Sequence, residues 1–203
     1  GKPPDRKYFA DAEALMRDPV TGDTMVWFEL DHRAQRYRGV SACMPESLAV
    51  AAYAVERPDA IRRWKSNQGV EAAAPDGRAI LLLAEGEPAG EGQMAAVRID
   101  GGKVTALRYP APEGLLATSL VELEPGSHLL LQRRMPGLGG FRATLSLLRF
   151  AADGTPERSE IARLAPPLTV DNMEALALRR EGGRTFVYIA SDDNFLPLQR
   201  TLL

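Results

Sequence analysis

The sequence NMEALAL at residues 172–178, followed by TFVYIA at residues 185–190, decides the fold. A glycine turn, EGGR at residues 181–184, separates these two apolar stretches, and the second is rich in residues that favour strands. The order is a carboxylate at Glu174, an apolar strand, a glycine turn, a second apolar strand and a polar end at Ser191. Two strands around a glycine turn predict a β-hairpin.

The same order recurs three times upstream in the chain. One copy runs from DAEAL through TGD to TMVWF (residues 11–28), and another from QGVEA through PDGR to AILLLA (residues 68–84). A weaker copy runs from TSLV through EPGS to HLLL (residues 118–131). The first polar positions of the copies are Glu13, Glu71, Ser119 and Glu174, at intervals of 58, 48 and 55 residues. Propeller blades repeat at roughly 40–50 residues, and insertions lengthen the interval.

The repeat predicts an all-β chain, a β-propeller with four visible blades in a single domain over residues 1–203. The predicted blades cover residues 8–43, 66–110, 115–165 and 170–203, with further strands at 32–38, 94–100, 104–109, 142–150, 158–164 and 199–203. Short helices are predicted at residues 45–55 and 58–65, in an insertion over residues 45–65. The alternative is a β-sandwich with chance similarity among its hairpins, because apolar strands around glycine turns are common.

Composition narrows the class of protein. The formal net charge is -2, so no sequence-wide basic field attracts nucleic acid. The longest apolar runs, such as residues 79–84, are too short to span a bilayer. Cys43 is the single cysteine, which excludes an intrachain disulfide and a cysteine-based zinc site.

Three segments carry a resemblance to a known family. The run DNMEAL at residues 171–176, with IASDDNFLPLQRTLL at residues 189–203, resembles the C-terminal signature of the phytase-like family named for the esterase-like activity of phytase. LQRR (131–134) with LGGFR (138–142) is similar to its penultimate blade, and DAEAL (11–15) to an earlier one. The resemblance implies a propeller that hydrolyses a small-molecule ester or phosphoester. It also implies export to the periplasm or outside a bacterial cell, although no signal peptide stands at Gly1.

The resemblance leaves two architectures open. Similar family members are longer and carry more blades on the N-terminal side. The chain is then either a tight four-bladed ring or, as we favour, the C-terminal part of a larger propeller of about six blades. An open fragment exposes strand edges, which predicts self-association through blade edges.

The copies also predict a shared site. The innermost strand of each propeller blade lines the central channel, so Glu13, Glu71 and Glu174 are expected around one axis. Converging carboxylates repel one another, and a calcium ion bound by these three residues and Asp192 would relieve the repulsion. The alternative is that the glutamates bind backbone N–H groups and hold neighbouring blades together.

A second polar ring is expected at the ends of the second strands. Because these strands run antiparallel to the first, their ends return to the same face of the blades. The predicted ligand-binding residues are Glu29, Glu85, Arg133, Asp193 and Asn194. The arginine suits a phosphate or carboxylate on a ligand. The alternative is turn capping by the aspartates and asparagine, and a solvated or ion-paired arginine.

His32 follows the first copy closely and is the predicted general base at the channel mouth, with a loop histidine of no catalytic role as the alternative. Two functions therefore stay open. One is a metal-dependent hydrolase of an ester or phosphoester, in which calcium polarises the substrate and orients water. The other is a non-catalytic propeller that binds a ligand or a protein, so the sequence does not decide whether the chain is an enzyme.

Overall fold

The computed structural model describes residues 12–28, 32–38, 53–55, 57–65, 68–137 and 140–203. Within these ranges the strands form four antiparallel sheets, which the text numbers in chain order. The expected all-β class is confirmed. In the described parts of the chain, no helix combines the length and apolar character needed to cross a membrane.

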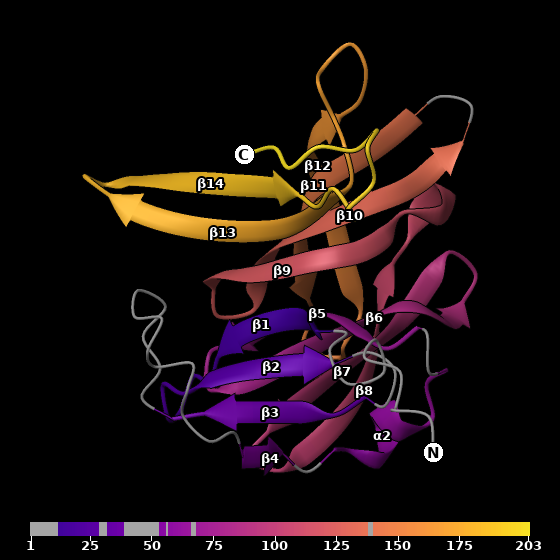
Figure 1. The fold of residues 1–203 in the computed structure, drawn as a ribbon. Helices are drawn as coiled ribbons and strands as arrows, with labels where there is room; N and C mark the ends of the chain where they lie inside the picture. The colour runs from indigo at the N-terminus through magenta and orange to yellow at the C-terminus, as the bar shows by residue number, and fades with distance from the viewer. Residues whose placement is uncertain (1–11, 29–31, 39–52, 56, 66–67, 138–139) are drawn as a thin grey trace, which may run out of the picture.

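Each of the first three sheets follows the order of its strands in the chain (Figure 1). The first sheet contains β1 (Ala12–Arg17), β2 (Thr24–Phe28), β3 (Ala34–Tyr37) and β4 (Tyr53–Val55). The second contains β5 (Val70–Asp76), β6 (Ala79–Gly90), β7 (Gln93–Asp100) and β8 (Lys103–Pro110). The third contains β9 (Leu116–Glu124), β10 (Ser127–Gly137), β11 (Gly140–Phe150) and β12 (Pro156–Leu164). The fourth pairs β13 (Met173–Glu181) with β14 (Arg184–Ser191).

The sheets are arranged in a propeller-like manner through their first strands. β1 contacts β5, β5 contacts β9, and β9 contacts β13. Figure 1 shows β13, β9 and β1 one below another, with β2, β3 and β4 leading away from β1 on the far side from β9. Closure of this arrangement into a ring and the number of blades stay predictions.

Alternation along the central strands explains the continuous apolar runs of the sequence. On β6, Leu82 packs with the first sheet, whereas Leu81 and Leu83 pack with the third. On β10, Leu130 faces the second sheet and Leu131 faces the fourth. Successive side chains of a strand point to opposite faces, so a sheet between two others needs apolar residues at every position.

The fourth sheet is less complete than the others. Phe186, Val187 and Tyr188 on β14 are 41%, 38% and 38% exposed. The strand predicted at residues 199–203 is not present, which corrects the expectation. Instead, Ser191 N donates to Leu202 O at 3.1 Å, and Leu202 N donates to Ser191 Oγ at 2.9 Å, so only the end of β14 is covered.

The helical insertion is also corrected. Residues 53–55, predicted as the end of a helix at residues 45–55, form β4 instead, where Val55 pairs with Ala34 of β3. Residues 45–52 lie outside the described residues. Tyr and Val favour strands, and pairing with β3 supplies the hydrogen bonds that decide between helix and strand. The second helix shortens to α2 (Asp59–Arg62), with Pro58 at its start and Ile61 buried. A 3₁₀ helix, η2 (Pro112–Gly114), connects the second sheet to the third.

Candidate active site

A β-bulge recurs near the start of the first strand in each sheet. The pairings of β1, β5 and β13 with their neighbours each shift register by one residue, and the residues skipped are Glu13, Glu71 and Glu174. A bulge turns its side chain away from the regular alternation of the strand. Each of the three repeated glutamates therefore occupies a bulge position, whereas the core residues around them follow the regular alternation of the strand.

The third sheet carries the same bulge one residue before the predicted anchor. The pairing of β9 with β10 skips Thr118, so Thr118 rather than Ser119 is equivalent to the glutamates. Thr118 Oγ1 donates to Met173 O at 3.0 Å, and Ser119 Oγ accepts from Leu176 N at 3.2 Å. Both residues therefore fasten the third sheet to the fourth.

Arg133 on β10 joins residues from three sheets. Its Nη2 lies 3.1 Å from Glu174 Oε1 and 3.7 Å from Glu85 Oε1, and its Nη1 donates to Asn172 Oδ1 at 2.6 Å. The arginine side chain is only 14% exposed, which strengthens charge-assisted contacts relative to the surface. One guanidinium thus connects the second, third and fourth sheets at the same end as the bulges.

Among the described carboxyl groups, Glu174 has the most strongly shifted pKa. Burial raises its pKa to about 7, and the nearby charges of Glu13 and Glu85 act in the same direction, against Arg133 and Asn172. Asn172 Nδ2 donates to Glu174 Oε1 at 2.7 Å, so both described contacts hold Oε1. Oε2 has no partner among the described residues, and the side chain is 30% exposed.

Tyr109 shows that Glu71 and Glu85 share the same electrostatic surroundings. Burial raises the pKa of its hydroxyl far above the ordinary value, and the charges of Glu71 and Glu85 add to the effect. The hydroxyl donates to Ala84 O at 2.5 Å. Burial also raises the pKa of Glu85, which Arg133 opposes. We call the following residues the central cluster: Glu13, Glu71, Glu85, Arg133, Asn172 and Glu174.

The central cluster can hold protons and orient a polar ligand. It combines four carboxyl groups with one guanidinium, so its carboxylates compete for positive charge. Within the described ranges, no group of three or more histidine, cysteine, aspartate or glutamate residues is arranged to hold a metal ion. Arg133 Nη2 already faces oxygens of Glu85 and Glu174, so the described donor set does not fit calcium by itself. Calcium stays a prediction.

The predicted residues after β14 lie in a turn of their own. Asp192 Oδ1 accepts from Asn194 N at 3.1 Å, and Asp193 Oδ1 accepts from Phe195 N at 2.9 Å. Asn194 Nδ2 donates to Gln199 Oε1 at 2.8 Å. These contacts are typical of turn capping. The metal role of Asp192 and the ligand roles of Asp193 and Asn194 stay predictions.

His32 is buried, with 5% of its surface exposed. Its Nε2 lies 2.9 Å from Trp64 O, and because a carbonyl only accepts, this nitrogen carries the proton. The contact connects the segment before β3 to the segment after α2, and none of the described contacts of His32 reaches the central cluster. Its role as a base stays a prediction, and Glu29 lies outside the described residues.

Asn172 and Tyr109 are the residues of this region that the sequence did not single out for the site. Asn172 contacts both Arg133 and Glu174, and its position two residues before a bulged glutamate is the available signal. The sequence gives no such signal for Tyr109, because this residue lies in an outer strand and reaches the site through packing and through its hydrogen bond to Ala84 O.

The sequence model of a family described as "Phytase-like: Esterase-like activity of phytase" matches residues 1–195. No curated protein matches the chain.

Proposed function

The chain belongs to the phytase-like family, and from this premise we propose that it hydrolyses an ester or phosphoester of a small molecule, with Glu174 as the group that transfers the proton. A single observation supports the role. Glu174 is a partly exposed carboxyl group with its Oε1 held by Arg133 and Asn172 and with a pKa of about 7. Such a group accepts and returns a proton near neutral pH.

The proposed step is attack by water on the ester. Glu174 Oε2 takes a proton from the water as the water oxygen bonds to the acyl carbon or the phosphorus. The bond to the leaving oxygen then breaks, and that oxygen receives the proton from Glu174. Arg133 and Asn172 act as positioning residues, because their contacts fix the carboxyl group through Oε1.

The test is hydrolysis of 4-nitrophenyl butyrate and of phytate by the wild type, by Glu174→Gln and by Glu157→Gln. Glu157 is an exposed glutamate of β12 and serves as the matched control. Loss of a general base lowers kcat/KM by roughly 100- to 10,000-fold, so Glu174→Gln should fall in this range and Glu157→Gln should equal the wild type. Wild-type activity should rise with pH around a midpoint near 7, because only the ionised carboxylate accepts the proton.

Each assay is run with and without a chelator and with added calcium. A loss that calcium restores would support the predicted metal dependence. Full activity of Glu174→Gln would refute the role of this residue. A wild-type protein that turns over neither substrate but is stabilised against heat by one of them would support the alternative of a non-catalytic binding protein.

Export and self-association belong to the same proposal and need separate measurements. The exposed residues of β14, including Phe186 and Tyr188, support self-association through this strand. Sedimentation over a range of protein concentrations measures it directly.

A further inference from the structure

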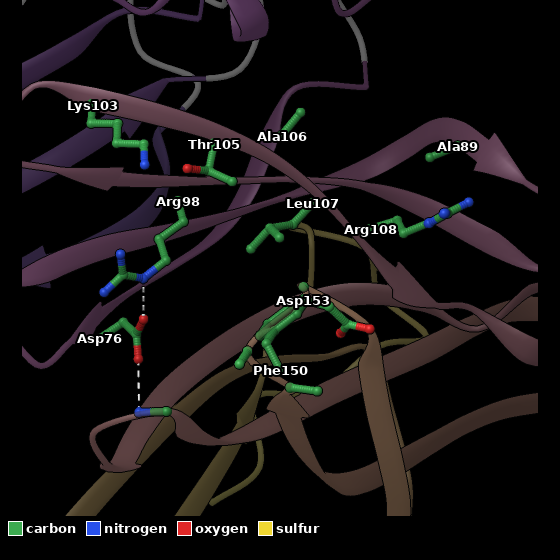
Figure 2. Close-up of a pocket in the computed structure, with 14 residues that line it drawn as sticks. Asp76, Ala89, Arg98, Lys103, Thr105, Ala106, Leu107, Arg108, Phe150 and Asp153 are labelled. Carbon is green, nitrogen blue, oxygen red and sulfur yellow. Dashed lines mark hydrogen bonds and ion pairs between the residues drawn. The ribbon is translucent and has the colours of Figure 1, made fainter.

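A cavity of about 680 Å³ lies between the second and third sheets, outside the central cluster (Figure 2). Its walls come mainly from β8 and the turn between β11 and β12, and β7 contributes Arg98. None of its lining residues belongs to the central cluster. The volume falls within the range of roughly 300–1,000 Å³ that is typical of small-molecule sites.

One end of the cavity is polar because of the register between β7 and β8. Thr105 pairs with Arg98, and Lys103 pairs with Asp100, so these side chains share one face of the hairpin. Figure 2 shows the Lys103 amino group and the Thr105 hydroxyl on the same side of the cavity as the Arg98 guanidinium. Lys103 forms no ion pair with any residue that the structure describes. Its positive charge is therefore available to a ligand.

Arg98 is held in place by two aspartates. Its Nε donates to Asp76 Oδ2 at 2.6 Å, and its Nη1 donates to Asp100 Oδ2 at 2.9 Å. Asp76 Oδ1 accepts from Gly126 N at 2.8 Å, so both oxygens of this carboxylate are already engaged. Arg98 is therefore fixed at the polar end beside the exposed side chains of Lys103 and Thr105, and Asp76 is not open to compete for a ligand cation.

The other end of the cavity is apolar and closely packed. Leu107 follows Thr105 by two residues on the same face, and Phe150 lies across from it. A Cβ atom at Gly154 would lie 3.0 Å from Leu107 Cδ2, and this glycine has a φ of +83°. The turn between β11 and β12 therefore approaches Leu107 as closely as a glycine allows, which gives the apolar wall a defined shape.

The remaining charged residues do not oppose an anion at the polar end. Asp153 Oδ1 accepts from Thr155 N at 2.8 Å, and in Figure 2 the carboxylate is turned away from Lys103. Arg108 lies on the opposite side of Leu107 from Lys103 and adds a positive charge there.

We propose that this cavity binds a small amphipathic anion, with a carboxylate or phosphate at Lys103 and Thr105 and an apolar chain against Leu107 and Phe150. The site is separate from the hydrolytic one, so it stands or fails independently of the proposed function. The shared chemistry is an anionic head on an apolar chain, and the test distinguishes the two kinds of head.

Isothermal titration calorimetry of the full chain tests the site with hexanoate, hexyl phosphate, 1-hexanol and inorganic phosphate. One of the two amphipathic anions, or both, should bind at a single site and more tightly than 1-hexanol or inorganic phosphate. Lys103→Gln should weaken this binding about tenfold, because it removes a charge-assisted hydrogen bond. The matched control Lys65→Gln removes an exposed lysine elsewhere and should leave binding unchanged.

Two further variants secure the interpretation. Leu107→Asn should weaken hexanoate and hexyl phosphate but not inorganic phosphate, and Glu174→Gln should leave binding unchanged because it alters only the central cluster. The proposal is overturned if no probe saturates one site, if 1-hexanol binds as tightly as hexanoate and hexyl phosphate, or if Lys65→Gln weakens binding as much as Lys103→Gln.

Discussion

The central cluster and the contacts around Asp76 each place carboxyl groups around one arginine, but the pKa of the principal carboxyl group shifts in opposite directions. We call Asp76, Arg98, Asp100 and His128 the rim cluster. In the central cluster, burial and neighbouring carboxylates outweigh Arg133 and raise the pKa of Glu174 to about 7. In the rim cluster, burial also raises the pKa of Asp76, but hydrogen bonds from Arg98 and Gly126 N outweigh it and leave the pKa below its ordinary value.

The difference follows from how much each carboxylate shares its partners. Arg98 Nε lies 2.6 Å from Asp76, and the second acid that it binds, Asp100, is 51% exposed. Arg133 Nη2 lies 3.1 Å from Glu174 and is shared with Glu85, which is only 20% exposed. A well-satisfied carboxylate stabilises the fold, whereas an incompletely satisfied one is suited to proton transfer.

His128, the fourth member of the rim cluster, also has a structural role. It is fully buried, and burial lowers its pKa, which favours the neutral ring at pH 7. Its Nε2 donates to Pro75 O at 2.9 Å and so ties β10 to β5. The comparison therefore indicates a stabilising role for the rim cluster and supports the proposed functional role of the central cluster.

The largest effect is expected from Arg133→Met, which leaves Glu85 and Glu174 half-buried without their cation. We expect a loss of about 2–4 kcal/mol in the free energy of unfolding at pH 8. The loss should be smaller at pH 5, below the pKa of Glu174, where this carboxyl group is protonated. Denaturant unfolding at both pH values measures it, and Arg134→Met, which removes the adjacent exposed arginine, is the control.

The same variant also sharpens the functional side of the comparison. Arg133 lowers the pKa of Glu174, so its removal should move the midpoint of the pH profile for hydrolysis above that of the wild type. If the midpoint stays in place and the stability loss is equal at pH 5 and pH 8, Arg133 does not influence the ionisation of Glu174.

A smaller loss is expected from Asp76→Ala, about 2 kcal/mol at pH 7, because Arg98 and Gly126 N lose their acceptor. The folded pKa of Asp76 lies below its unfolded value of about 3.8, so this stability is present above pH 3.8 and disappears as the pH falls through the folded pKa. Unfolding at pH 7 and at the lowest pH where the wild type folds checks the direction. Asp100→Ala should cost much less, and a similar cost would contradict the distinction between the two acids.

The smallest effect is expected from Thr118→Val, about 1 kcal/mol, because one buried hydrogen bond to Met173 O is lost. Thr185→Val on exposed β14 is the control and should change the unfolding free energy by less. Activity per folded molecule should stay at the wild-type level. An activity loss as large as that of Glu174→Gln would place Thr118 among the functional residues.

The sequence predicted the sheets well because the signal is local. Runs such as residues 79–84 are apolar at every position, and a strand packed on both faces needs this pattern. Residues 53–55 were predicted as helix because their strand partner, β3, is distant in sequence. Long-range pairing outweighs local preference at such places.

The candidate site was predictable only where the repeat exposes it. Glu174 stood out because its copies share a glutamate, but the copy in the third sheet was misplaced by one residue, since a bulge leaves no mark in the letters TSLV. His32 forms a buried hydrogen bond to a carbonyl 32 residues away, and the raised pKa of Glu174 depends on residues from other sheets. Neither can be derived from a local pattern.

The repeated bulge has a consequence for how such a protein diversifies. Because the bulged residue is skipped by strand pairing, its side chain can be exchanged without a change in the register of the other residues of the strand. The threonine at position 118, where the other sheets carry glutamate, shows one such exchange within a single chain. Residues at these positions can therefore diverge one sheet at a time while the strands stay paired, as the glutamate of the fourth sheet in the central cluster and the threonine that fastens the third sheet to the fourth illustrate.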